Sequence, residues 1–582
     1  MAVYTFNIIL YGLLTTAVLC LIHVVSLSTT TALRRSRWWW WWWQRQSLDL
    51  HSLPTLPLFL TASEHALRDA DKIAIIDKTK GQCFTYRQLL ADVAALKSQL
   101  LHELHRALTG DLEERRVAFL VPNGYDYVVT QWAIWAAGGV CVPLCTTHPV
   151  KELLYTIGDS EPSLIVIHSV FEKVLLSLRQ QAHKNARFMS LAPLEVRNQL
   201  APSIPLPSFS DIMPVDRRAL IIYTSGTTSR PKGCVTTHQN ITFQAECLIK
   251  AWQLTASDLL IHVLPLHHVH GIVNALTATL LSGGTVEMYP KFDAKTTWER
   301  WQDKGASTTF MAVPTIYSRL VDYFNLDIRG TEREPAARAG ANALRLLISG
   351  SAALPTPTRN RFAQITGHIL LERYGMTEIG MGISCGLDPN KRPDGSVGWP
   401  LPGVEVRLVD QESGRVIDSA DEDGMIEIKG QNVFFEYWKQ PAETAKAFTR
   451  DGWFKTGDIA RRDRTGAYFI QGRESVDVIK SGGYKVSALE VERTMLTLES
   501  IQEAVVVGVR DEEWGQRVAA VVTQRPGTPP LELNQVRSYL KSEIATYKIP
   551  TILITVDLID RNAMGKVDKK ALVKKYWPEL MN

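Results

Sequence analysis

The sequence predicts an α/β fold with an α+β cap, that is, a large N-terminal body of mostly parallel sheets flanked by helices and a small C-terminal domain. The chain has 582 residues, which is too long for one ordinary hydrophobic core. From about Leu58, strand-like and helix-like patterns alternate, as is typical of parallel sheets covered by helices. Near residue 471 this alternation gives way to a mixed pattern of about 110 residues, the size of an independent domain.

The alternation predicts individual elements of the body from β-branched and apolar runs. The predicted elements are strands at 116–121, 139–144, 164–167 and 219–223 and a helix at 126–137. The segment 328–342 is rich in Ala, Arg, Gly and Glu, and we expect it to form a mobile surface loop.

The C-terminal pattern begins with two strands that flank a short polar link. The predicted order is strand 468–470, strand 478–480, helix 488–498, strands 504–509 and 518–523, helix 533–544 and strand 552–556. This order divides the chain into a large domain at 49–472, a link at 473–477 and a small domain at 478–582.

Composition excludes several classes of protein. The chain is 45% hydrophobic and 21% charged, as soluble globular proteins are. Its formal net charge of +4 is not gathered into a basic stripe, so we expect no nucleic-acid partner. Its seven cysteines form no CxxC pair, which suits a reducing compartment and argues against a disulfide framework.

The first 48 residues differ from the rest of the chain. Residues 1–33 contain no Lys, Arg, Asp or Glu, and four arginines then precede the first acidic residue, Asp49. This pattern permits an organelle transit peptide, a membrane anchor or an artefact of the predicted start. Membrane association is possible only through residues 1–33, and the tryptophan run at 38–43 indicates no function.

The strongest chemical motif is the sequence YTSGTTSRPKG at 223–233. Glycines and small hydroxyl residues let a loop wrap phosphate oxygens closely, and Lys232 adds a cation. A polar surface loop is the alternative. The order Lys232-Gly233-Cys234 excludes a Walker loop, which needs Ser or Thr directly after the lysine. The predicted phosphate-binding residues are Thr224, Ser225, Gly226, Thr227, Thr228, Ser229, Arg230, Pro231 and Lys232.

Six further motifs follow this loop in a fixed order. They are SGSAALP at 349–355, ERYGMTE at 372–378, TGD at 456–458, GR at 472–473, SGGYK at 481–485 and NAMGK at 562–566. With the loop, they resemble the acyl-adenylate-forming superfamily over residues 60–575, and most closely its mitochondrial malonyl-CoA and methylmalonyl-CoA synthetases. The resemblance implies an ATP-dependent acid–thiol ligase that forms an acyl-AMP and passes the acyl group to coenzyme A.

The resemblance also implies roles for individual residues around the nucleotide. Glu378 matches the magnesium ligand, and Thr377 matches a position that contacts the phosphates. Asp458 and Arg473 match residues that bind the ribose. Ser351, Ala352 and Tyr374 match other nucleotide-binding positions.

Further roles concern the reaction itself. Lys566 resembles the lysine that bridges the acyl carboxylate and the α-phosphate, and it is expected to be catalytic together with Thr224, Glu378 and His268. In relatives the small domain rotates after adenylation and brings the region of Gly482 and Gly483 to the thiol-transfer face. The hinge is expected within the link at 473–477.

The acid is less well defined by the sequence. His267, His268 and His270 permit a metal site, but adjacent histidines in an extended segment point apart, so we place His268 at the acyl pocket. A dicarboxylate needs a cation for its second charge, since an unpaired buried carboxylate costs several kcal/mol. Arg373 is the first candidate and Arg319 the second. The alternative for Arg373 is a structural ion pair with a neighbouring acid.

The expected substrates are ATP, coenzyme A and malonate or methylmalonate, with Mg²⁺ as the metal. Three other functions stay open at this point: a medium-chain fatty acyl-CoA synthetase, a carrier-protein adenylation enzyme, and a membrane-anchored nucleotide binder without catalysis. The resemblance favours the mitochondrial matrix, with membrane anchoring through the N-terminal segment as the alternative.

Overall fold

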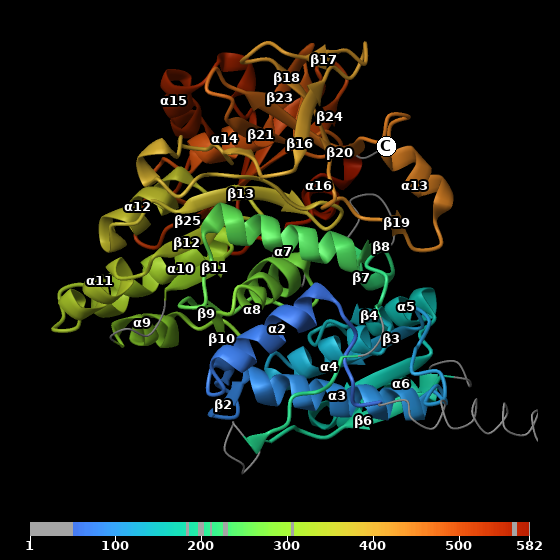
Figure 1. The fold of residues 1–582 in the computed structure, drawn as a ribbon. Helices are drawn as coiled ribbons and strands as arrows, with labels where there is room; N and C mark the ends of the chain where they lie inside the picture. The colour runs from blue at the N-terminus through green and yellow to red at the C-terminus, as the bar shows by residue number, and fades with distance from the viewer. Residues whose placement is uncertain are drawn as a thin grey trace, which may run out of the picture.

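The computed structural model describes residues 50–181, 186–195, 203–209, 212–224, 231–303, 308–561 and 567–580. The N-terminal segment 1–48 therefore lies outside the described residues. Within the described ranges, four sheets organise the chain (Figure 1). No helix in these ranges is both long enough and apolar enough to cross a membrane.

The first sheet has nine strands, and its centre from β13 to β1 is parallel. In spatial order the strands are β15 (Trp399–Pro400), β14 (Gly380–Ser384), β13 (Leu371–Met376), β12 (Leu346–Ser349), β11 (Thr309–Ala312), β9 (Leu259–His262), β10 (Thr285–Met288), β1 (Ile73–Asp77) and β2 (Gln82–Thr85).

The second sheet has seven strands and is parallel from β7 to β6. In spatial order they are β19 (Glu436–Tyr437), β8 (Lys232–Thr237), β7 (Arg218–Thr224), β4 (Val140–Pro143), β3 (Arg116–Leu120), β5 (Leu164–His168) and β6 (Phe188–Leu191). The two sheets confirm the predicted α/β fold with mostly parallel strands.

Two smaller sheets follow. The third is antiparallel and contains β17 (Val416–Ile417), β16 (Glu405–Val409), β18 (Asp423–Lys429), β20 (Phe454–Arg462) and β21 (Tyr468–Arg473). The fourth contains β23 (Tyr484–Ser487), β22 (Val478–Ser481), β25 (Gly515–Gln524), β24 (Ile501–Asp511) and β26 (Ile552–Thr555). All strands of the fourth sheet lie after residue 477, and in Figure 1 its elements lie at the opposite end of the molecule from α3.

The α-helices cover and connect these sheets. They are α2 (Pro57–Arg68), α3 (Tyr86–Glu103), α4 (Tyr125–Ala136), α5 (Val150–Ser160), α6 (Glu172–Gln181), α7 (His238–Trp252), α8 (Ala278–Leu281), α9 (Ala294–Gln302), α10 (Pro314–Tyr323), α11 (Glu334–Asn342), α12 (Thr356–Thr366), α13 (Pro441–Ala447), α14 (Ala488–Met495), α15 (Leu533–Glu543) and α16 (Lys569–Tyr576).

Helix α4 shows how the two large sheets form one core. Every residue of α4 is buried, and the helix packs against β1 of the first sheet and β4 of the second. A helix that is apolar on all sides belongs inside a core. The helix has one acidic residue, Asp126. Its Oδ1 pairs with Lys80 Nζ at 2.7 Å, and its Oδ2 lies 3.0 Å from His168 Nε2.

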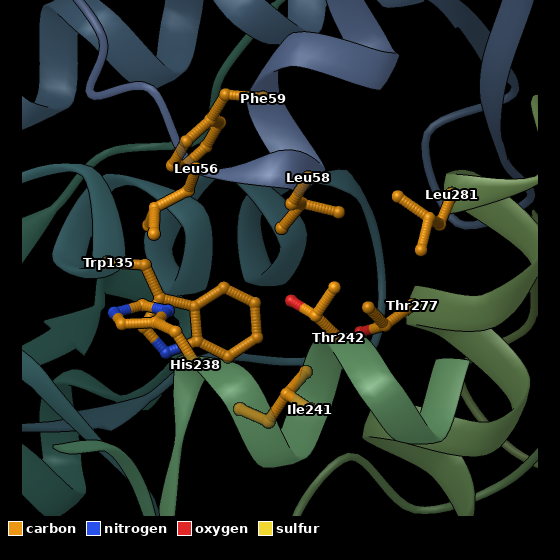
Figure 2. A pocket seen from close by; sticks show the side chains of 9 residues that line it. All are labelled: Leu56, Leu58, Phe59, Trp135, His238, Ile241, Thr242, Thr277 and Leu281. Carbon is orange, nitrogen blue, oxygen red and sulfur yellow. The ribbon is translucent and has the colours of Figure 1, made fainter. Parts of the chain in front are cut away.

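A small apolar pocket lies where α2, α4 and α7 meet near Leu281 (Figure 2). Trp135 and His238 lie side by side on one wall, and Leu58 faces them. Its free volume of about 10 Å³ is that of one water molecule at most. Burial lowers the pKa of His238 to about 3, so this histidine is neutral. The pocket is a gap in packing that cannot hold a small carboxylic acid.

The expectation of a mobile loop at 328–342 is wrong. Residues 334–342 form α11, whose Ala337 and Ala341 are fully buried. These two alanines are four residues apart and therefore lie on one face of the helix. Small side chains make this face easy to overlook in the sequence, but they allow α11 to pack closely against α9.

This close packing predicts that Gly340→Ala destabilises the protein. A Cβ atom at residue 340 would lie 2.2 Å from the carbonyl oxygen of Trp301, so one of the two helices has to move. We expect the unfolding free energy to fall by about 1–3 kcal/mol, measured as a lower thermal midpoint. Gly158→Ala in α5 is the control, because nothing lies within 4 Å of that Cβ position. An unchanged or higher midpoint for Gly340→Ala would contradict the packing.

Candidate active site

Arg373 is a buried cation in the middle of β13, only 3% exposed. It lies opposite Ser384 of β14. Gly350, directly after β12, leaves the space that its guanidinium occupies, because a Cβ atom there would lie 2.5 Å from Arg373 Cζ. The fold thus brings a charged group into the core at the end of the parallel strands.

The described residues do not neutralise this charge. Arg373 Nη2 donates a hydrogen bond to Ser351 Oγ at 3.3 Å, whereas Nε and Nη1 have no hydrogen-bond partner among the described residues. No described carboxylate forms an ion pair with it, and burial lowers the pKa of Arg373 to about 9. The alternative of a structural ion pair with a neighbouring acid is therefore not supported in this part of the chain.

Neutral groups surround the guanidinium. His270 is 6% exposed, and its Nδ1 lies 3.4 Å from Ser351 Oγ. Burial, followed by the nearby charge of Arg373, lowers the pKa of His270 well below its ordinary value. The hydroxyl of Tyr317 donates to the carbonyl of Ile348 at 2.8 Å. Arg373, His270 and Tyr317 are buried and Ser351 is half-buried. We call this cluster of four side chains, with its one positive charge, the anion pocket.

A second cluster joins the third sheet to β13. Asp458 Oδ2 accepts a hydrogen bond from the Tyr374 hydroxyl at 2.6 Å, and Asp458 Oδ1 accepts one from Arg473 Nε at 2.9 Å. Asp458 and Arg473 lie opposite each other in the β20–β21 pair. Against the opposing effect of burial, Asp458 raises the pKa of Arg473. The cluster presents a buried carboxylate that two neighbours hold in one orientation.

A third group of residues lies around Tyr437. The Tyr437 hydroxyl donates to Glu378 Oε1 at 2.8 Å, and Lys232 Nζ lies 5.1 Å from the centroid of the Tyr437 ring. Lys232 Nζ also donates to Glu443 Oε2 at 2.7 Å. Burial raises the pKa of Glu378 above its ordinary value, although the Tyr437 hydrogen bond opposes this. The second sheet thus supplies Lys232 and Tyr437, and Tyr437 contacts both this lysine and the buried Glu378 in the turn between β13 and β14.

The second and third groups are connected, because Glu378 and Asp458 both contribute to the raised pKa of Arg473. Arg373 directly precedes Tyr374 in β13, so its side chain points to the opposite face of that strand. The strand β13 thus separates the Arg373 group on one face from the other two groups on the other face. This combination of cations, carboxylates and a buried anion pocket can bind a polyanion together with a small acid.

Comparison with known protein families shows to which family the chain belongs. The family described as AMP-binding enzyme matches residues 62–438, which is more than half of the chain. The chain belongs to this family. The AMP-binding enzyme C-terminal domain also matches, over residues 490–566.

Relatives within the AMP-binding enzymes are similar over nearly their whole length. The mouse protein named Malonate–CoA ligase ACSF3, mitochondrial, is 42% identical, and the match covers 91% of this chain and 92% of that protein. Malonate–CoA ligase of Arabidopsis thaliana is 36% identical, with 89% and 88% covered. The crystal structure of ATP-bound MatB from Rhodopseudomonas palustris is 33% identical with a TM-score of 0.78, covering 89% of this chain and 98% of that one.

The structure describes only part of the predicted phosphate loop. Thr224 ends β7, and its Oγ1 lies 3.4 Å from the carbonyl oxygen of Lys232, which begins β8. The loop thus connects two antiparallel strands, and α7 begins only after β8. Pro231 is half-buried. The remaining predicted residues Ser225, Gly226, Thr227, Thr228, Ser229 and Arg230 lie outside the described residues, as does Lys566.

Other predicted residues differ in how close they lie to these groups. Ser351 belongs to the anion pocket and has a left-handed backbone, with φ at +68°. Ala352 is exposed, and Thr377 is half-buried beside Glu378. Arg319 is exposed on α10, so it does not join Arg373 in the buried pocket.

The histidines and the glycine pair occupy two separate segments. The rings of His267 and His268 lie 4.1 Å apart, and His268 contributes to the lowered pKa of the pocket residue His270. No group of three or more metal-binding side chains assembles within the described ranges. Gly482 and Gly483, with φ at +56° and +81°, form the tight turn between β22 and β23, which needs glycine-like backbone angles.

Sequence reasoning missed several members of the site. Tyr437 and Glu443 lie in no predicted motif, yet they contact Glu378 and Lys232. Strand β19 is only two residues long, and its pairing with β8 joins residues about two hundred positions apart. Only that long-range pairing places Tyr437, so no local signal could have indicated it.

The Lys232–Glu443 contact predicts that Glu443→Gln strengthens nucleotide binding. In its predicted role as a phosphate ligand, Lys232 exchanges Glu443 for a phosphate when a nucleotide binds, and removal of the competing charge lowers the free-energy cost of that exchange. We expect the dissociation constant for ATP to fall about threefold, because an exposed ion pair contributes up to about 1 kcal/mol. Isothermal titration calorimetry measures this constant.

The control for Glu443→Gln is Glu422→Gln, which removes an acid from the exposed pair with Arg415 and is expected to leave ATP binding unchanged. Weaker ATP binding by Glu443→Gln would contradict the competition between Glu443 and phosphate.

Proposed function

We propose that this protein is an ATP-dependent malonate–CoA ligase that also accepts methylmalonate. The observation that carries the proposal is the buried guanidinium of Arg373, which has no described carboxylate within ion-pair distance. The names of the animal and plant relatives support the same acid. A related crystal structure is described as a malonyl-CoA ligase complex with methylmalonyl-CoA and AMP, at 33% identity and a TM-score of 0.59.

The reaction has two steps. A carboxylate oxygen of the acid attacks the α-phosphorus of ATP, the bond to the β-phosphate breaks, and pyrophosphate leaves. The sulfur of coenzyme A then attacks the acyl carbon, AMP leaves, and the thiol loses its proton. Both steps bring anionic groups together, so cations have to offset their repulsion.

We assign roles to the residues by their chemistry. Arg373 binds the carboxylate that does not react. Its unpartnered Nη1 and its Nη2, whose one bond is the 3.3 Å contact to Ser351, form one edge of the guanidinium for a bidentate contact. The second carboxylate then supplies the negative charge that the pocket lacks. A medium-chain fatty acid has no such group and would leave the guanidinium unpaired in an apolar environment.

The nucleotide lies over the other two groups in this proposal. Asp458 accepts hydrogen bonds from the ribose hydroxyls, since a carboxylate has two oxygens for two donors. Arg473 and Tyr374 hold that carboxylate in place, and Lys232 approaches the phosphates. Lys566 keeps its predicted role of bridging acid and α-phosphate.

We propose Mg²⁺ as the metal, because the hard carboxylate of Glu378 suits a cation that also binds phosphate oxygens. Bound there, the ion would neutralise phosphate charge. We also propose a mitochondrial location, which the names of the animal relatives support.

Release of pyrophosphate with a panel of acids tests the function. Purified protein with ATP, Mg²⁺ and coenzyme A is expected to release pyrophosphate fastest with malonate, more slowly with methylmalonate, and only slowly with acetate and octanoate. A preference for octanoate, or no AMP with any acid, would contradict the proposal.

Arg373→Met is predicted to abolish the preference for malonate. Loss of one partner of a buried charge pair costs about 2–5 kcal/mol, so kcat/KM for malonate should fall on the order of 100-fold or more. Activity with acetate should not fall in parallel, because acetate has no second carboxylate. Steady-state assays with both acids measure the change.

Arg319→Met is the matched control for this variant, because Arg319 is exposed on α10 and lies outside the pocket. We expect its kcat/KM for malonate to match that of the unmodified protein. Equal losses with malonate and acetate in Arg373→Met would indicate general damage to the site and would contradict the assigned role.

A further inference from the structure

The link between β21 and β22 closes on itself through Asp477. The N–H of Asp477 donates to the carbonyl of Arg473 at 2.7 Å, and the N–H of Arg473 donates to Asp477 Oδ2 at 3.0 Å. Gly472 allows this close approach, since a Cβ atom there would lie 2.4 Å from Asp477 Cβ. Two hydrogen bonds therefore span the link from one strand to the next.

The other oxygen of Asp477 faces the C-terminal elements. Lys569 Nζ of α16 lies 2.6 Å from Asp477 Oδ1 and 2.7 Å from Glu492 Oε1 of α14. Burial opposes the charge of Lys569, but Glu492 and Asp477 raise its pKa above the ordinary value. The carbonyl of Asp477 accepts from the N–H of Ala488 at 2.7 Å. Asp477 is thus fixed to the small-domain side by two elements, α14 and α16.

Arg473 is fixed to the opposite side. Its guanidinium bonds Asp458 of β20, and the next residue, Glu474, donates its N–H to the carbonyl of Gly457 at 3.1 Å. A rotation of the C-terminal elements about residues 474–477 has to break the bonds between Arg473 and Asp477. The same rotation leaves the contact between Asp477 and Lys569 intact, because both residues move together.

The comparison structures differ in how well they superpose on the whole chain. The TM-score is 0.78 for ATP-bound MatB and 0.59 for the complex with methylmalonyl-CoA and AMP, although both are 33% identical to this chain. The chain as a whole therefore superposes better on the ATP-bound structure.

We propose that the Asp477 carboxylate is a latch that holds the small domain in the adenylating orientation, and that Lys569 is the positioning residue that aims this carboxylate at Arg473. The inference rests on the proposed two-step function. Adenylation then depends on the latch, whereas thioester formation takes place after the latch has opened. Lys569 fixes the carboxylate within the small domain, so that the latch can close again after each turnover.

Asp477→Ala tests the latch. It leaves Lys569 paired with Glu492, so no buried charge is stranded. We expect acid-dependent ATP–pyrophosphate exchange to fall about tenfold relative to thioester formation from supplied malonyl-AMP and coenzyme A, the effect of one hydrogen bond to a charged group. The control is Asp560→Ala, which removes an exposed partner of Lys575 and should leave both half-reactions within about twofold.

Lys569 is tested by a conservative pair of variants. Lys569→Met should shift the ratio of the two half-reaction rates in the same direction as Asp477→Ala. Lys569→Arg retains the positive charge, so its ratio should stay close to that of the unmodified protein. If Lys569 had only a structural role, Lys569→Met would lower the rates of both half-reactions equally and would also lower the thermal midpoint.

An unchanged ratio of the half-reactions in Asp477→Ala would overturn the latch, provided that the unmodified protein carries out both. If the unmodified protein carries out neither with any acid, the proposed function fails instead. The two failures are therefore distinguishable.

Discussion

The buried charge of Arg373 is the constraint on which the substrate site depends. A guanidinium in the core costs several kcal/mol unless an anion or several hydrogen bonds compensate it. Around Arg373 the described residues supply one hydroxyl contact and a neutral histidine. The fold retains this cost in the middle of β13, one residue after the parallel pairing with β12 ends. Ligands commonly bind where the parallel strands of α/β sheets end. A ligand with a free carboxylate turns the same charge into binding energy.

The remaining geometry follows from how the sheets meet. The first sheet carries Arg373, Tyr374 and Glu378, the second carries Lys232, and the third carries Asp458 opposite Arg473. Hydrogen bonds of Asp458 to Tyr374 and Arg473, and of Glu378 to Tyr437, fix these side chains before a ligand arrives, which reduces the entropy lost on binding. Because Arg473 also ends β21, the cluster of Asp458, Tyr374 and Arg473 and the segment between β21 and β22 share one residue.

Much of this architecture could be predicted from the sequence. Strands such as β3 and β7 carry continuous apolar runs. The family resemblance implied that Asp458 and Arg473 bind the same ribose, and the structure shows a hydrogen bond between these two side chains. Helix α11 was missed because alanine and glycine give little hydrophobic contrast. Tyr437 was missed because a two-residue strand places it through long-range pairing, and Glu443 was missed because it lies in the short helix α13 that follows this strand. The roles of residues 225–230 and Lys566, and the domain boundaries, remain predictions.

Comparison of malonate with malonamate tests the central claim most directly. The two acids have nearly the same shape, but the amide of malonamate carries no charge to pair with Arg373. The account predicts that kcat/KM for AMP formation is on the order of 100-fold higher with malonate. Equal values for the two acids would show that the guanidinium does not recognise a second carboxylate.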